Sequence, residues 1–89
     1  MMNHFEMVNI SLKTMGLPAF ISIKELKERY RVLANQNHPD FSGSPEKMAE
    51  INDAYNLLKE YMQNYKFSFS KDEVNRQFPQ DEYASRFRF

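Results

Sequence analysis

The stretch that decides the fold is SIKELKERYRVLANQNHPDFSGSPEKMAEINDAYNLL, residues 22–58. It begins with the spacing of a capping box, because the side chains of Ser22 and Glu25 can each accept a hydrogen bond from the other residue's backbone N–H. Apolar side chains then recur at the period of a helix. We therefore predict a helix from Ile23 that ends near Asn37, with an inner face made of Leu26, Tyr30, Leu33 and Ala34.

The tripeptide His38-Pro39-Asp40 comes at the end of this predicted helix. Proline has no backbone N–H and disfavours helical geometry in the residue before it, so the helix should stop here. An imidazole beside a carboxylate can present a donor, an acceptor and a negative charge to another molecule. We interpret the tripeptide as a recognition corner; the alternative is that it is only a helix stop and a turn.

A further helix is predicted to begin at Pro45, where a missing N–H costs nothing, with Ser44 as its cap. The helical period then continues without interruption through Met48, Ile51, Ala54, Tyr55, Leu58, Met62 and Tyr65. A connection of about seven residues allows the two helices to run antiparallel. The recognition corner would then lie at the tip of a helical hairpin.

A shorter helix should precede the hairpin. Phe5, Val8, Leu12 and Met15 recur at helical spacing, and Gly16 is suited to end the helix in a left-handed conformation. The sequence offers two starting points for this helix, Asn3 and Asn9.

The chain ends in an aromatic-rich extension, residues 67–89. A second capping-box spacing, from Ser70 to Glu73, predicts a short helix from Lys71 to Gln77. We expect the extension to fold back on residues 1–66 and to stabilise them. The alternative is an exposed patch that binds a client or a second copy of the chain through Phe67, Phe69, Phe78 and Phe87.

Composition narrows the classes of function. A chain of 89 residues suits one small domain without an elaborate catalytic cavity, so we expect no enzyme. Twelve basic and twelve acidic side chains give zero net charge and no general attraction to nucleic acid or to a membrane surface. Cysteine is absent, which fits a cytoplasmic location, and no apolar run is long enough to span a membrane. His38 and Asp40 lack a nearby third ligand, so we expect neither metal nor cofactor.

Three segments together resemble the J domain of the DnaJ-type, heat-shock-40 class co-chaperone family. They are the basic helix 23–34 with its Tyr30-Arg31 pair, the tripeptide His38-Pro39-Asp40, and residues 50–58 with an Ile-Asn-x-Ala-Tyr-x-x-Leu pattern. The likeness spans roughly residues 9–65 in matching order and spacing. It implies an all-α, J-domain-like fold in which helices two and three form an antiparallel hairpin, with a short first helix and the helical, aromatic extension added.

The resemblance also implies a function. The chain would be a co-chaperone that docks on a DnaK-type chaperone of the heat-shock-70 class and stimulates its ATP hydrolysis. Carried over by position, Lys27, Tyr30 and Arg31 would belong to the docking face, and His38-Pro39-Asp40 would trigger the ATPase. The alternative is a J-like helical adaptor, including one associated with nucleic acid, that no longer stimulates an ATPase.

The charge pattern agrees with a docking face on the first hairpin helix. Residues 23–38 carry four basic and two acidic side chains, whereas residues 39–65 carry two basic and five acidic ones. Lys27 and Arg31 are four residues apart and hence on one side of a helix. An ordinary solvated surface is the alternative interpretation, above all for Lys24 and Arg29.

Overall fold

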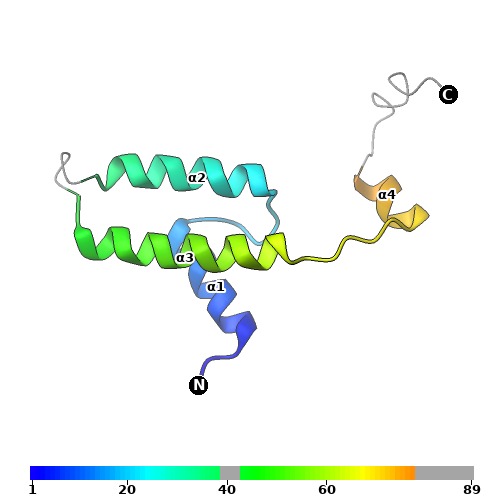
Figure 1. Ribbon diagram of the computed structural model, residues 1–89, viewed down its shortest axis with the longest axis horizontal. Coiled ribbons are helices and arrows are strands. Elements are labelled where there is room, and N and C mark those ends of the chain that lie inside the picture. Colours follow the sequence, from blue (N-terminus) through cyan, green and yellow to red (C-terminus); the bar gives the residue numbers. More distant parts are fainter. Residues whose placement is uncertain (39–42, 78–89) are drawn as a thin grey trace.

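The computed structural model describes residues 1–38 and 43–77, which form four helices and no strand. Helix α1 spans His4–Met15, α2 spans Ile23–Gln36, α3 spans Pro45–Gln63 and α4 spans Lys71–Gln77. Helices α2 and α3 lie side by side and antiparallel, and α1 packs chiefly against α3 (Figure 1). The all-α hairpin with a short first helix, expected from the sequence, is confirmed.

Local capping explains where the helices begin and end. The side-chain oxygen of Asn3 accepts a hydrogen bond of 2.8 Å from the backbone N–H of Glu6, which selects Asn3 over Asn9 as the start of α1. Gly16 ends that helix with a φ of 68°, a left-handed conformation that glycine adopts without strain. Both hydrogen bonds of the expected capping box join Ser22 and Glu25 at the start of α2.

The hydrophobic core lies where α1 meets the hairpin. Its buried side chains come from all three helices and are Met15, Leu26, Leu33, Ile51, Ala54 and Leu58. Burying a Leu, Ile or Met side chain contributes about 1.5–3 kcal/mol, so the five such residues besides Ala54 account for much of the stability that so small a domain can have. Each of these residues falls on the helical period read from the sequence.

The described part of the aromatic extension lies apart from this core. After α3 the chain runs away from the hairpin, and α4 is separated from the other three helices (Figure 1). Helix α4 contributes no buried residue, and the side chains of Phe67 and Phe69 are 73% and 86% exposed. Residues 67–77 therefore show no fold-back packing of these phenylalanines. Phe78 and Phe87 lie outside the described residues, and the role of the extension stays a prediction.

Candidate functional site

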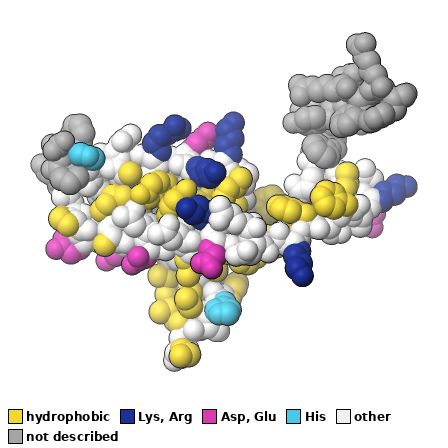
Figure 2. Space-filling model, viewed as in Figure 1, with side chains coloured by type: hydrophobic (Ala, Val, Ile, Leu, Met, Phe, Trp, Pro, Cys, Tyr) yellow, Lys and Arg dark blue, Asp and Glu magenta, His cyan; other side chains and the backbone are white. Residues whose placement is uncertain are grey.

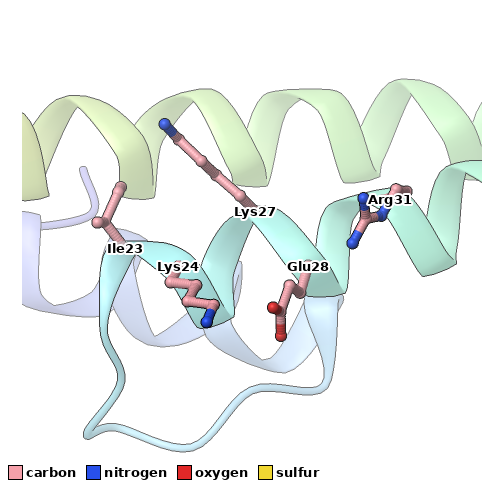
Figure 3. A pocket seen from close by; sticks show the side chains of 5 residues that line it. All are labelled: Ile23, Lys24, Lys27, Glu28 and Arg31. Atoms are coloured by element: carbon pink, nitrogen blue, oxygen red, sulfur yellow. The ribbon is translucent and has the colours of Figure 1, made fainter.

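Two cationic side chains, Lys27 and Arg31, lie exposed and one helical turn apart on α2. They line a shallow hollow of about 320 Å³ together with Ile23, Lys24 and Glu28. All five side chains extend from α2, with Ile23 at one end of the row and Arg31 at the other (Figure 3). The hollow thus combines an apolar side chain with three cationic ones and one carboxylate.

Three of the four charged side chains that line this hollow are cationic. Lys and Arg side chains gather over α2, whereas Asp and Glu side chains lie mostly along the outer edge of α3 (Figure 2). Within the part of the chain that the structure describes, Lys27 and Arg31 form no ion pair. Their charges are therefore available to an acidic surface on another molecule, which they would attract and orient.

Tyr30 borders the same surface but turns toward α3. Its ring stacks on that of Tyr55, with ring centres 4.2 Å apart and planes inclined by 20°. Its hydroxyl donates a hydrogen bond of 2.6 Å to the side-chain oxygen of Asn52. The ammonium group of Lys59 lies 5.1 Å from the centre of the Tyr55 ring. Tyr30 is thus half-buried, and its polar atom is directed inward rather than toward solvent.

His38 is exposed directly beyond the end of α2. The side-chain amide of Asn37 donates to the carbonyl of Leu33 at 2.9 Å, and its backbone N–H donates to the same carbonyl at 3.1 Å, so the end of the helix is closed. The backbone N–H of Gly43 then donates to the carbonyl of His38 at 3.4 Å. Pro39 and Asp40 lie outside the described residues.

Glycine is required at position 43 for a steric reason. A Cβ atom added there would overlap the backbone of Asn37. The two ends of the connection therefore approach each other more closely than a side chain would allow. This approach brings the end of α2 and the start of α3 together at the tip of the hairpin.

The start of α3 adds a carboxylate beside this tip. Ser44 accepts a hydrogen bond from the backbone N–H of Lys47 at 3.2 Å and donates its hydroxyl to Glu46 at 2.9 Å. The pKa of Glu46 lies below its ordinary value. The first cause is a hydrogen bond from the backbone N–H of Glu46 itself, and the second is the hydrogen bond from the Ser44 hydroxyl. Glu46 is thus held in its charged form at the positive end of the helix dipole.

Arg29 has a role that sequence reasoning missed. Its Nε donates a hydrogen bond of 2.8 Å to the carbonyl of Met15. A Cβ atom at Gly16 would lie 2.9 Å from Nη2 of the same guanidinium. The interpretation of Arg29 as an ordinary solvated residue is therefore wrong, because it ties α2 to the end of α1. Its spacing from Lys27 and Arg31 gave no signal of this contact.

The described residues form neither a metal site nor a membrane span. No group of three or more His, Cys, Asp or Glu side chains in residues 1–38 and 43–77 could hold a metal ion. No helix of the same residues is both long enough and apolar enough to cross a bilayer.

Comparison with known proteins identifies one family. The family model for the DnaJ domain matches residues 12–67. A Tetratricopeptide repeat and J domain-containing co-chaperone DNJ1 of Mycosarcoma maydis is 46% identical over 46 residues, which are 52% of this chain and 8% of the relative. Chaperone protein dnaJ A6 of Oryza sativa subsp. japonica is 46% identical over 52% of this chain and 11% of its own length.

A bacterial relative gives the same result. Chaperone protein DnaJ of Mycoplasmopsis pulmonis is 47% identical over 49 residues, which are 52% of this chain and 13% of the relative. No solved structure matches the chain significantly. The chain thus spans 8–13% of the length of these three relatives. The range matched by the family model includes α2, α3 and the connection between them. On the match of the family model to residues 12–67, this chain belongs to the DnaJ domain family.

Proposed function

We propose that this protein is a co-chaperone that docks on a DnaK-type, heat-shock-70 class chaperone and stimulates its ATP hydrolysis. The observation that carries the proposal is that Lys27 and Arg31 are exposed on α2 within the DnaJ domain match, on the helix that ends at the exposed His38. Relatives that share this domain bear the names chaperone and co-chaperone. The protein itself supplies binding energy and no reacting group.

The proposed division of labour follows from charge and position. Lys27, Arg31 and the neighbouring Lys24 would attract an acidic groove of the chaperone and align α2 with it. The segment His38-Pro39-Asp40 would then meet the ATPase at the end of α2. Asp40 is suited to form a charge-assisted pair with an arginine of the partner. Stimulation would result if the protein bound one conformational state of the chaperone more tightly than another.

The docking half of the proposal is tested by binding to an immobilised DnaK-type chaperone in ATP and in ADP. Reversing both charges, Lys27→Glu with Arg31→Glu, should weaken binding by roughly tenfold or more and flatten its salt dependence. The matched control reverses Lys13 and Lys66, two exposed lysines away from the hollow. Equal loss in both variants, or no loss in either, would favour the adaptor interpretation.

A second role is proposed for the aromatic side chains at the end of α3 and the start of the extension, and their exposure is the observation that favours it. Tyr61, Tyr65 and Phe67 are 56%, 55% and 73% exposed and form a row of edge-to-face contacts, with ring centres 6.1 and 5.6 Å apart. Contiguous exposed aromatic surface marks a site of interaction. We propose that this row and Phe69 bind a client or a second copy of the chain.

Sedimentation with and without an unfolded client separates the two partners. A second copy would raise the sedimentation coefficient of the protein alone as concentration increases. A client would add mass only when present. The double variant Phe67→Ser with Phe69→Ser should abolish whichever interaction is seen. If this variant binds as well as the wild type, these aromatic side chains are not the binding site.

A further inference from the structure

Few directional contacts fix the rotation of α2 about its own axis. Its two buried side chains are Leu26 and Leu33, whose packing has no directional preference. Within residues 1–38 and 43–77, the one side-chain hydrogen bond between α2 and α3 is that from the Tyr30 hydroxyl to Asn52, at 2.6 Å. This contact is directional, as is the stacking of Tyr30 on Tyr55. The hydrogen bond from Arg29 to the carbonyl of Met15 is also directional, but it holds α2 to the end of α1.

Tyr30 occupies the boundary between the core and the cationic surface of α2. At about 100° per residue, its side chain lies about 40° around the helix from Leu26 and about 60° from Lys27. A rotation of α2 that broke the Tyr30 contact would therefore turn Lys27 and Arg31 by the same angle. The contact with α3 thus helps to set the direction of the exposed cations on α2.

We infer that Asn52 is a positioning residue for the docking face, and this inference rests on the proposed function. By accepting the Tyr30 hydroxyl, Asn52 holds α2 in the orientation that presents Lys27 and Arg31 to the chaperone. The Tyr30 hydroxyl is directed at α3 and does not contact the chaperone. Tyr30 therefore contributes to docking through Asn52.

A double-mutant cycle tests this inference. Tyr30→Phe keeps the ring and removes the hydroxyl, whereas Asn52→Ala removes its acceptor. Each variant should raise the concentration of protein that gives half-maximal ATPase stimulation by about three- to tenfold, the factor that corresponds to one net hydrogen bond. The double variant should show no more loss than the larger single change, and maximal stimulation should stay the same.

The matched control is Asn56→Ala, which removes the same side chain from an exposed position one turn along α3. It should leave half-maximal stimulation unchanged. If Tyr30→Phe impairs stimulation but Asn52→Ala does not, or if their effects multiply, the chaperone contacts the hydroxyl and the inference is wrong. It is also wrong if neither variant differs from the Asn56 control.

A partner-free measurement keeps the inference testable on its own. In the free protein, Tyr30→Phe and Asn52→Ala should shift the backbone amide NMR signals of Lys27 and Arg31 in the same directions, while Asn56→Ala leaves them in place. Loss of stability alone would lower the melting temperature without this shared pattern. If the wild-type protein fails to stimulate any DnaK-type chaperone, the proposed function fails, and the NMR comparison still decides the role of Asn52.

Discussion

Aromatic side chains are half-buried between the two helices of the hairpin but exposed beyond the end of α3. Between α2 and α3, Tyr30 and Tyr55 are stacked, half-buried and joined to polar partners. Beyond α3, Tyr65 and Phe67 also touch, but both remain more than half exposed. The comparison teaches that a contact between rings stabilises a fold only where it also removes apolar surface from water. The stability of this protein should therefore reside in α1, α2 and α3.

The largest effect is expected from opening a cavity in the core. Ile51 is fully buried, so Ile51→Ala should lower the free energy of unfolding by about 2–5 kcal/mol. Phe67→Ala removes a larger side chain from an exposed position and should change it by less than about 0.5 kcal/mol. Urea denaturation followed by circular dichroism measures both. Comparable losses would show that the extension belongs to the core.

Two arginines allow the same comparison of the first three helices with the extension, with smaller expected losses of stability. Arg29→Met removes the hydrogen bond to the carbonyl of Met15 and should cost about 1–2 kcal/mol. Arg76→Met removes an ion pair to Glu73 in which the arginine side chain is 71% exposed, and such pairs contribute little. Thermal melting of the two variants is the measurement. A larger loss for Arg76→Met would reverse the assignment of stability to the first three helices.

A smaller effect depends on pH. The pKa of Glu46 is lowered in the folded protein from an ordinary value of 4.5, by the hydrogen bond from its own backbone N–H and then by Ser44. Such a group stabilises the fold above the unfolded pKa, and the contribution is lost as pH falls through the folded pKa. Glu46→Gln should therefore reduce the drop in melting temperature on acidification. Glu60→Gln, near the other end of α3, is the control, and an equal reduction in both would remove Glu46 as the cause.

The smallest effect is expected in the extension. The side chains of Phe67 and Phe69 are already exposed, so replacing both by serine should leave the melting temperature unchanged. Differential scanning calorimetry at equal protein concentration provides the comparison. A clear drop in melting temperature would instead support the sequence-based expectation that the extension folds back and stabilises residues 1–66.

Features decided by neighbouring residues could be predicted from the sequence. The caps at Ser22 and Gly16 and the start of α3 at Pro45 depend on a few consecutive residues, and each was predicted correctly. The contacts from Arg29 to Met15 and from Tyr30 to Asn52 join residues 14 and 22 positions apart. They depend on how the helices cross, which helical periodicity does not specify.

The candidate site divides in the same way. The exposure of Lys27 and Arg31 follows from their place beside the apolar face of α2 and not on it, so periodicity was enough to predict it. Tyr30 lies on the predicted inner face. Its hydrogen bond to Asn52 could not be predicted, because nothing in the sequence distinguishes this asparagine from the other polar residues of the helix. Whether these residues dock on a chaperone stays a prediction.

The most direct test of the account is single-turnover ATP hydrolysis by a DnaK-type chaperone in the presence of His38→Gln. Because His38 is exposed, the substitution should leave the melting temperature nearly unchanged while abolishing stimulation. His4→Gln, which alters the other histidine of the chain at the exposed start of α1, should stimulate as well as the wild type. A His38→Gln protein that is folded and stimulates normally would contradict the co-chaperone function proposed for this chain.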